Sequence, residues 1–234
     1  MIPLRDDNPT EITPVVTVGL IVACVGVFLY QAMLWGRDNE MFVYQYGVIP
    51  AVVFANAEMP IEFGAVSPYG SLITSMFLHG GWMHLIGNML YLWIFGNNIE
   101  DIMGHGRFIV FYAMCGIVAA LAHAATDPQS VIPMIGASGA ISGILGAYLL
   151  LYPYAKVLVL IPLGFVSQMV YVPAVLVLGL WFVMQVLYGG FSIGSEGGGV
   201  AFFAHVGGFL AGMALIGFFK HSHVRFFHPP HWHS

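Results

Sequence analysis

The sequence predicts an all-α, polytopic membrane protein with six transmembrane helices. Hydrophobic residues make up 59% of the 234 residues and charged residues only 7%, whereas roughly 25% of residues are charged in soluble globular proteins. Long apolar runs recur along the chain, and the few basic residues fall almost entirely on one side of them. This composition excludes a soluble enzyme, a disordered chain and a nucleic-acid-binding protein, since the last of these needs a basic surface.

Six apolar runs account for the predicted spans, because a helix crosses the hydrocarbon core with about 20 residues. In chain order they cover residues 15–34, 80–99, 108–125, 137–152, 170–188 and 200–219. The fourth run is short, and His84 and Asn88 interrupt the second. Pro162 and Gly164 interrupt a further apolar stretch at 157–168, so we expect a connection that lies along the membrane surface.

Basic residues orient the spans. With six spans, five of the six Lys and Arg residues fall on one side: Arg5, Arg107, Lys156, Lys220 and Arg225. By the positive-inside rule, both termini are therefore expected to be cytoplasmic. The outer side then holds the loops at 36–79, 126–136 and 189–199. We divide the chain into a cytoplasmic segment (1–14), a membrane domain (15–219) and a His-rich cytoplasmic tail (220–234).

The acidic, polar residues before the first run do not resemble a signal or transit peptide. We therefore expect a multi-pass protein of a prokaryotic plasma membrane, in contact with membrane lipids. Glu100 and Asp101 are expected to form a solvated end to the second span.

Four polar side chains are predicted to share one depth in the outer leaflet. At 1.5 Å per residue, His84 lies about 6 Å, Asn88 about 12 Å and His205 about 7 Å below the outer boundary. The fourth span is shorter than the hydrocarbon core, so its start at Ser138 is sunk below the surface. Polar side chains inside a bilayer are costly and are usually functional. The spans also contain His123, Ser142 and Gln185.

The residue types suggest nucleophilic catalysis. A serine hydroxyl is a weak nucleophile unless a base accepts its proton, and His205 is the candidate base for Ser138. Ser138 starts a helix, where unpaired backbone N–H groups can stabilise an oxyanion. His84 and Asn88, spaced i, i+4 on one helix face, can add donors. With no carboxylate within the spans to orient His205, we expect a dyad and no metal or cofactor.

Small residues offer a way to bring the dyad together. Gly208 and Gly212 form a small-xxx-small face on the sixth span, and such faces let membrane helices approach closely. We expect this face to pack the sixth span against the fourth.

Three motifs together resemble the rhomboid family of intramembrane serine proteases. They are LHGGWMHLIGN at 78–88, GASG at 136–139, and AHVGG at 204–208 followed by Gly212. The resemblance implies a six-helix bundle in which Ser138 is the nucleophile and His205 the general base. It also implies an oxyanion hole made by His84, Asn88 and the Ser138 N–H.

The same resemblance implies a substrate class and a mode of access. Substrates would be single-span membrane proteins cut near the outer face, admitted by movement of the fifth span and the loop at 189–199. Many members carry an aromatic residue four positions after the serine, where this chain has Ser142. Ser142 is expected to bond to a backbone carbonyl one turn back.

Other interpretations of these residues remain open. Considered by itself, Ser138 would most often be a helix N-cap. Asn88 by itself would most often form a hydrogen bond between two helices. The histidines His79, His84, His123 and His205 could hold a metal or haem in a transporter or electron carrier, because imidazole suits such metals. A non-catalytic relative that binds membrane proteins is the third possibility. For His79 itself, a structural loop contact is the preferred interpretation.

Overall fold

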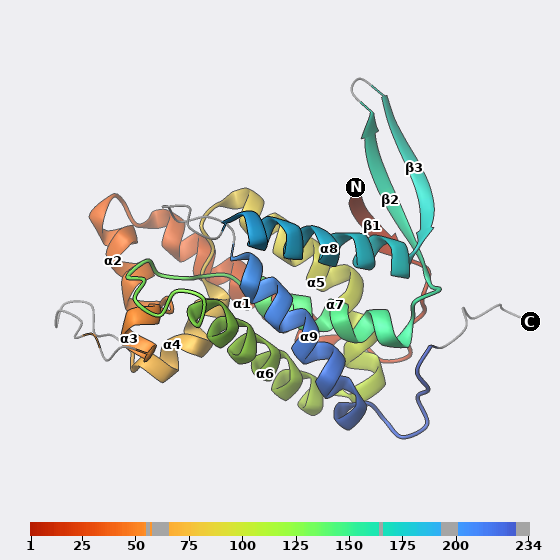
Figure 1. Ribbon diagram of the computed structural model, residues 1–234. Helices are drawn as coiled ribbons and strands as arrows, with labels where there is room; N and C mark the ends of the chain where they lie inside the picture. The colour runs from red at the N-terminus through yellow and green to blue at the C-terminus, as the bar shows by residue number, and fades with distance from the viewer. Residues whose placement is uncertain (55–56, 58–65, 164–165, 193–200, 228–234) are drawn as a thin grey trace, which may run out of the picture.

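The computed structural model is a helical bundle with a small sheet at one end (Figure 1). It describes residues 1–54, 57, 66–163, 166–192 and 201–227. The helices are α1 (Val15–Met33), α2 (Arg37–Tyr46), α3 (Pro50–Phe54), α4 (Pro68–Thr74), the 3-10 helix η2 (Ser75–Phe77), α5 (Trp82–Met103), α6 (His105–Ala124), α7 (Ser138–Leu151), α8 (Ala174–Ser192) and α9 (Phe202–Phe219). The strands are β1 (Ile2–Asp6), β2 (Lys156–Leu163) and β3 (Val166–Pro173).

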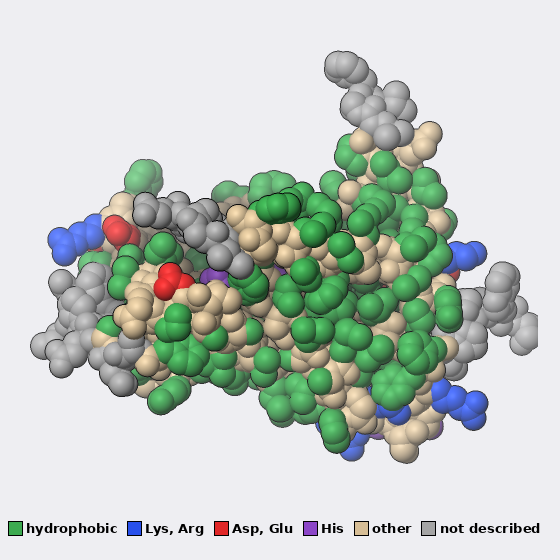
Figure 2. Space-filling view, in the orientation of Figure 1, with side chains coloured by type: hydrophobic (Ala, Val, Ile, Leu, Met, Phe, Trp, Pro, Cys, Tyr) green, Lys and Arg blue, Asp and Glu red, His purple; other side chains and the backbone are tan. Residues whose placement is uncertain are grey.

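A helix overlaps each of the six predicted runs, although α8 begins four residues after the start of the fifth. Within the described part of the chain, four helices are long and apolar enough to cross a membrane: α1, α6, α8 and α9. The apolar helix α7 has only 14 residues, and α5 carries two acidic residues near its end. Hydrophobic side chains cover the middle of the visible face, and the charged side chains lie toward the two ends (Figure 2). The chain is a polytopic helical membrane protein.

The predicted fifth span began too early. Residues 170–173 belong to β3, and the helix starts at Ala174. β2 and β3 pair as an antiparallel hairpin, with Leu158 opposite Tyr171, and β1 joins the other edge of β2. β-branched Val and Ile residues recur in this stretch and favour strands, and Pro173, at the strand end, cannot donate to a ladder. The described residues of the predicted connection, 157–163 and 166–168, therefore belong to these two strands, which project from the bundle (Figure 1).

The loop predicted at 36–79 contains helices among its described residues. It includes α2, α3 and α4, which lie together at the end of the bundle opposite the sheet (Figure 1), and the 3-10 helix η2. A β-bridge between Val48 and Met134 joins it to the loop at 126–136. In the loop predicted at 189–199, residues 193–199 lie outside the described residues, as do residues 228–234 of the His-rich tail.

The predicted solvated end of the second span is wrong for Glu100, whereas Asp101 is partly exposed and accepts hydrogen bonds from the Glu11 and Ile12 N–H groups. The Glu100 side chain is fully buried, and its oxygens accept hydrogen bonds from the Val16 and Thr17 N–H groups at 2.9 and 2.8 Å and from the Thr17 hydroxyl at 2.7 Å. His105 Nδ1 lies 2.6 Å from Glu100 Oε1. The first N–H groups of a helix lack intrahelical partners and carry partial positive charge. Glu100 therefore caps the start of α1 instead of facing water.

Glycines set the distance between α7 and α9. A Cβ added to Gly208 would overlap the Gly139 carbonyl oxygen, and one added to Gly212 would overlap the Gly143 carbonyl oxygen. The backbones therefore approach more closely than any residue with a side chain at these positions would allow. Van der Waals packing between small residues is the main source of helix association in a membrane.

Gly212→Ala tests this packing. Because the added methyl meets backbone atoms, which cannot rotate away, we expect a loss of about 1–3 kcal/mol in the free energy of unfolding. Gly217→Ala on the same helix is the control, because its nearest neighbour would lie 3.7 Å away. Thermal unfolding in detergent should show a lower midpoint for Gly212→Ala alone. Equal midpoints for the two variants would contradict the close-packing account.

Candidate active site

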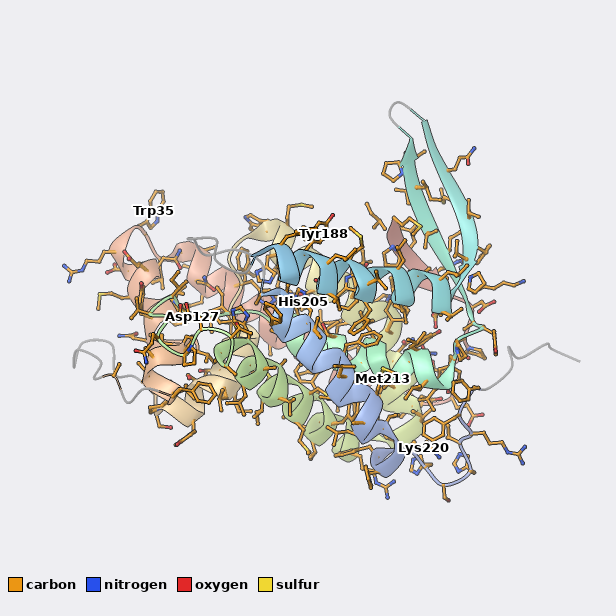
Figure 3. The ribbon with its side chains drawn as sticks, in the orientation of Figure 1. Trp35, Asp127, Tyr188, His205, Met213 and Lys220 are labelled. Carbon is orange, nitrogen blue, oxygen red and sulfur yellow. The ribbon has the colours of Figure 1, made fainter. Side chains whose placement is uncertain are left out.

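Ser138 and His205 meet between α7 and α9. His205 Nε2 lies 2.8 Å from Ser138 Oγ, although the two residues are 67 positions apart in sequence. Ser138 is the first residue of α7, and His205 lies in the first turn of α9, toward the end of the helix opposite Lys220 (Figure 3). His205 is 9% exposed. The geometry allows direct proton transfer between the hydroxyl and the imidazole.

Helix α8 holds the other side of the imidazole. Gln185 Oε1 lies 2.7 Å from His205 Nδ1, and because an amide oxygen only accepts, Nδ1 carries the proton. The neutral ring then presents a lone pair at Nε2, which accepts the hydrogen bond donated by the Ser138 hydroxyl. One turn before Gln185, the Trp181 ring lies 5.8 Å from the His205 ring, centroid to centroid. The Gln185 contact therefore leaves the Nε2 lone pair facing Ser138, and the Trp181 ring lies beside the imidazole.

His84 and Asn88 on α5 lie beside the backbone that leads into Ser138. A Cβ added to Gly136 would come 2.8 Å from His84 Nε2 and 3.8 Å from Asn88 Nδ2. Gly136 has φ +125°, a conformation that side-chain-bearing residues rarely adopt. The Gly80 N–H donates to His84 Nδ1 at 3.2 Å, so the proton of the neutral ring is on Nε2. Two N–H donors from α5 therefore lie next to the segment before Ser138.

The amide nitrogen of Asn88 is buried, and it lacks a partner in the part of the chain that the structure describes. Within the described residues, Asn88 Nδ2 has no hydrogen-bond acceptor, and the side chain is 8% exposed. A buried polar group normally finds a partner, and an exception calls for a reason such as a catalytic role or an ordered water. The Asn88 donor is thus free for a ligand or water at the site.

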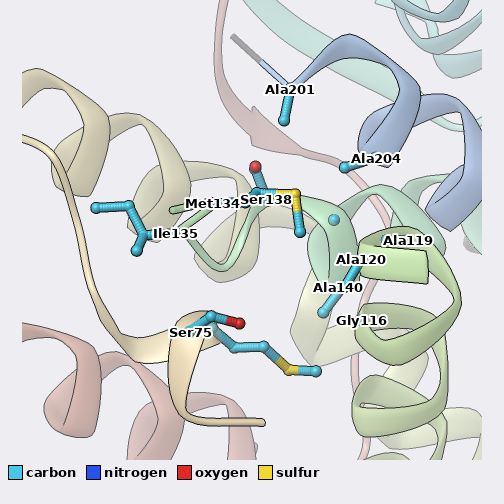
Figure 4. A pocket seen from close by; sticks show the side chains of 13 residues that line it. Ser75, Gly116, Ala119, Ala120, Met134, Ile135, Ser138, Ala140, Ala201 and Ala204 are labelled. Carbon is cyan, nitrogen blue, oxygen red and sulfur yellow. The ribbon is translucent and has the colours of Figure 1, made fainter. Parts of the chain in front are cut away.

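A small cavity adjoins the serine (Figure 4). Its water-accessible volume is about 20 Å³, and Ser138, Ser75, Gly116, Ala201 and Ala204 are among the residues that line it. A single water needs about 10–15 Å³ measured in this way. The cavity can therefore hold a water molecule next to the hydroxyl.

Ser142 and His79 have local hydrogen-bond partners, whereas His79 Nε2 and His123 Nδ1 are buried without a partner among the described residues. Ser142 Oγ donates to the Ser138 carbonyl at 2.6 Å, which confirms the predicted bond one turn back. His79 is fully buried, with Nδ1 3.2 Å from the Phe77 carbonyl oxygen and with backbone bonds to Gln31 on α1, so it braces the loop before α5. Among the described residues, no group of three or more His, Cys, Asp or Glu side chains is placed to hold a metal ion.

Sequence reasoning did not assign roles to Gln185 and Trp181. Both lie in an apolar run that was interpreted only as a span. The available signal was a lone amide within that run, four residues after a tryptophan and thus on the same helix face.

Comparison with known proteins places the chain in a family. A family model described as the Rhomboid domain matches residues 67–222, well over half of the chain. Rhomboid protease GluP of Bacillus subtilis (strain 168) is 32% identical over 135 residues, which are 51% of this chain and 26% of GluP. Rhomboid-like protein 11, chloroplastic, of Arabidopsis thaliana is 31% identical over 148 residues, 62% of this chain and 50% of that protein.

A match to an animal protein extends over more of the chain. Rhomboid-related protein 2 of Mus musculus is 24% identical over 206 residues, which are 86% of this chain and 63% of that protein. The chain thus spans between a quarter and two thirds of the length of these three relatives. The matched range of this chain, residues 67–222, contains the positions of Ser138, His205, His84 and Asn88. The chain belongs to the rhomboid family.

Proposed function

We propose that this protein is an intramembrane serine endopeptidase that uses a Ser138–His205 dyad. The observation that carries the proposal is the 2.8 Å contact between Ser138 Oγ and His205 Nε2. Membership of the rhomboid family and the protease names of its relatives support the same function.

Acylation follows from the positions of these two groups. Ser138 Oγ attacks the carbonyl carbon of the scissile peptide bond while its proton moves to His205 Nε2. When the tetrahedral intermediate collapses, the C–N bond breaks and the same proton passes from Nε2 to the leaving amine. The acyl group remains as an ester on Ser138.

Negative charge develops on the substrate carbonyl oxygen during the attack. Hydrogen-bond donors close to the Ser138 backbone are needed to stabilise it. The N–H of Ser138 is unpaired within its helix, because α7 begins there. His84 Nε2–H and the unpartnered Asn88 amide supply the further donors that we assign to the oxyanion hole. Donors fixed before the reaction in a water-poor site stabilise the transition state without having to reorient.

Deacylation requires one water. The cavity beside Ser138 is large enough to supply it. His205 Nε2 takes a proton from that water as the oxygen attacks the ester carbon. The proton then passes to Ser138 Oγ as the ester bond breaks, which releases the acid product and restores the free serine.

The placement of charge supports a six-span topology with both termini in the cytoplasm. Lys220 lies at the end of α9 away from His205 (Figure 3), and Arg107 Nη1 contacts the Phe219 carbonyl at that same end. The dyad then lies toward the outer face. We propose single-span membrane proteins as substrates, cut near that face, and a prokaryotic plasma membrane as the location.

Substitution of the dyad tests the enzymatic claim. Ser138→Ala and His205→Ala should each reduce cleavage of a membrane-anchored reporter by about 10⁴-fold or more, because the two groups act as a unit. Cleavage is measured with purified protein in liposomes, and thermal unfolding serves as the control for folding. Cleavage by Ser138→Ala at the wild-type rate would contradict the mechanism. Wild-type protein that binds reporters without cutting them would indicate a non-catalytic relative.

Asn88→Ala tests the oxyanion hole. Removal of one donor typically costs about 10²–10³ in kcat, so we expect slow but measurable cleavage. Ile86→Ala, on the exposed face of the same helix, is the control and should cleave normally. A wild-type kcat for the Asn88→Ala variant would show that Asn88 does not stabilise the oxyanion.

A further inference from the structure

Helix α8 contributes a polar side chain that the Ser–His mechanism does not assign. Gln185 is 9% exposed on a helix whose neighbouring side chains Val183, Val186 and Leu187 are about half exposed. An amide on an apolar helix is costly unless it is bonded. Its oxygen lies 2.7 Å from His205 Nδ1, so the amide is directed at the imidazole, not at lipid.

This contact selects the tautomer that the proposed reaction needs. With the proton held on Nδ1 by the Gln185 oxygen, Nε2 is the lone pair that faces Ser138 Oγ at 2.8 Å. The alternative tautomer would place a hydrogen on Nε2, and a lone pair on Nδ1 would face the lone pairs of the amide oxygen. That arrangement is repulsive on one side and provides no base on the other.

The same contact favours the charged intermediate. When Nε2 takes the serine proton, the ring becomes positive, and the Nδ1–H···Oε1 bond becomes a charge-assisted bond, which is shorter and stronger than a neutral one. The Trp181 ring, 5.8 Å away and on the same face of α8, offers the ring a further favourable contact in this state.

We propose that Gln185 is a positioning residue for the general base, occupying the place that a carboxylate takes in a Ser–His–Asp triad. The inference rests on the proposed protease function. It adds that α8, a helix separate from those that carry the dyad, makes His205 a more effective base.

Two substitutions at one position test this role. Gln185→Leu keeps most of the side-chain volume but has no acceptor, and Gln185→Glu keeps an oxygen acceptor. A hydrogen bond to a charged group corresponds to about a 10- to 100-fold effect, so Gln185→Leu should lower kcat by that factor and leave KM unchanged. Gln185→Glu should recover most of the lost kcat. Val186→Leu, a half-exposed neighbour on α8, should match wild type.

The outcomes separate this inference from the proposed function. If the wild type cleaves and Ser138→Ala does not, but Gln185→Leu retains wild-type kcat, the positioning role is excluded and the protease function stands. A Gln185→Glu variant as slow as Gln185→Leu, or a Gln185→Leu defect confined to KM or to the unfolding midpoint, also overturns the role. If the wild-type protein does not cleave the reporter, the proposed protease function itself is contradicted.

Discussion

The close approach of α7 and α9 is the constraint on which the candidate site depends. The 2.8 Å contact between the Ser138 hydroxyl and the His205 imidazole crosses an interface where the two helix backbones nearly touch. Gly208 and Gly212 on α9 face the Gly139 and Gly143 carbonyl oxygens, so no side chain at these two positions keeps the helices apart. The same glycines thus provide packing and position reactive groups.

The second constraint is that buried polar groups need hydrogen-bond partners. This requirement connects the site to a third helix, α8. The bonds from Ser138 to His205 and from His205 to Gln185 join α7, α9 and α8 in one chain. In a site of low polarity such bonds are strong, and an unmet donor is costly. The Asn88 amide is such a donor among the described residues, which fits a role that begins only when negative charge develops nearby.

Much of this arrangement was predictable from the sequence, because apolar runs locate helices in a membrane protein. Polar side chains are easily recognised within such apolar runs. The sequence alone therefore identifies Ser138 and His205 as candidate site residues. The partner of a buried group was harder to predict. Gln185 binds His205 across a helix interface, and Glu100 caps α1 from a distant part of the chain. The start of α8 was also misplaced, since apolar β-branched residues suit a strand and a span equally.

The central claim is that His205 activates the Ser138 hydroxyl across the α7–α9 interface. Reaction with a fluorophosphonate, followed by peptide mass spectrometry, measures this without knowledge of any substrate. The account predicts one labelled residue, Ser138, in the wild-type protein and almost none in His205→Ala protein that remains folded. Labelling at another serine, or equal labelling of Ser138 in both proteins, would contradict it.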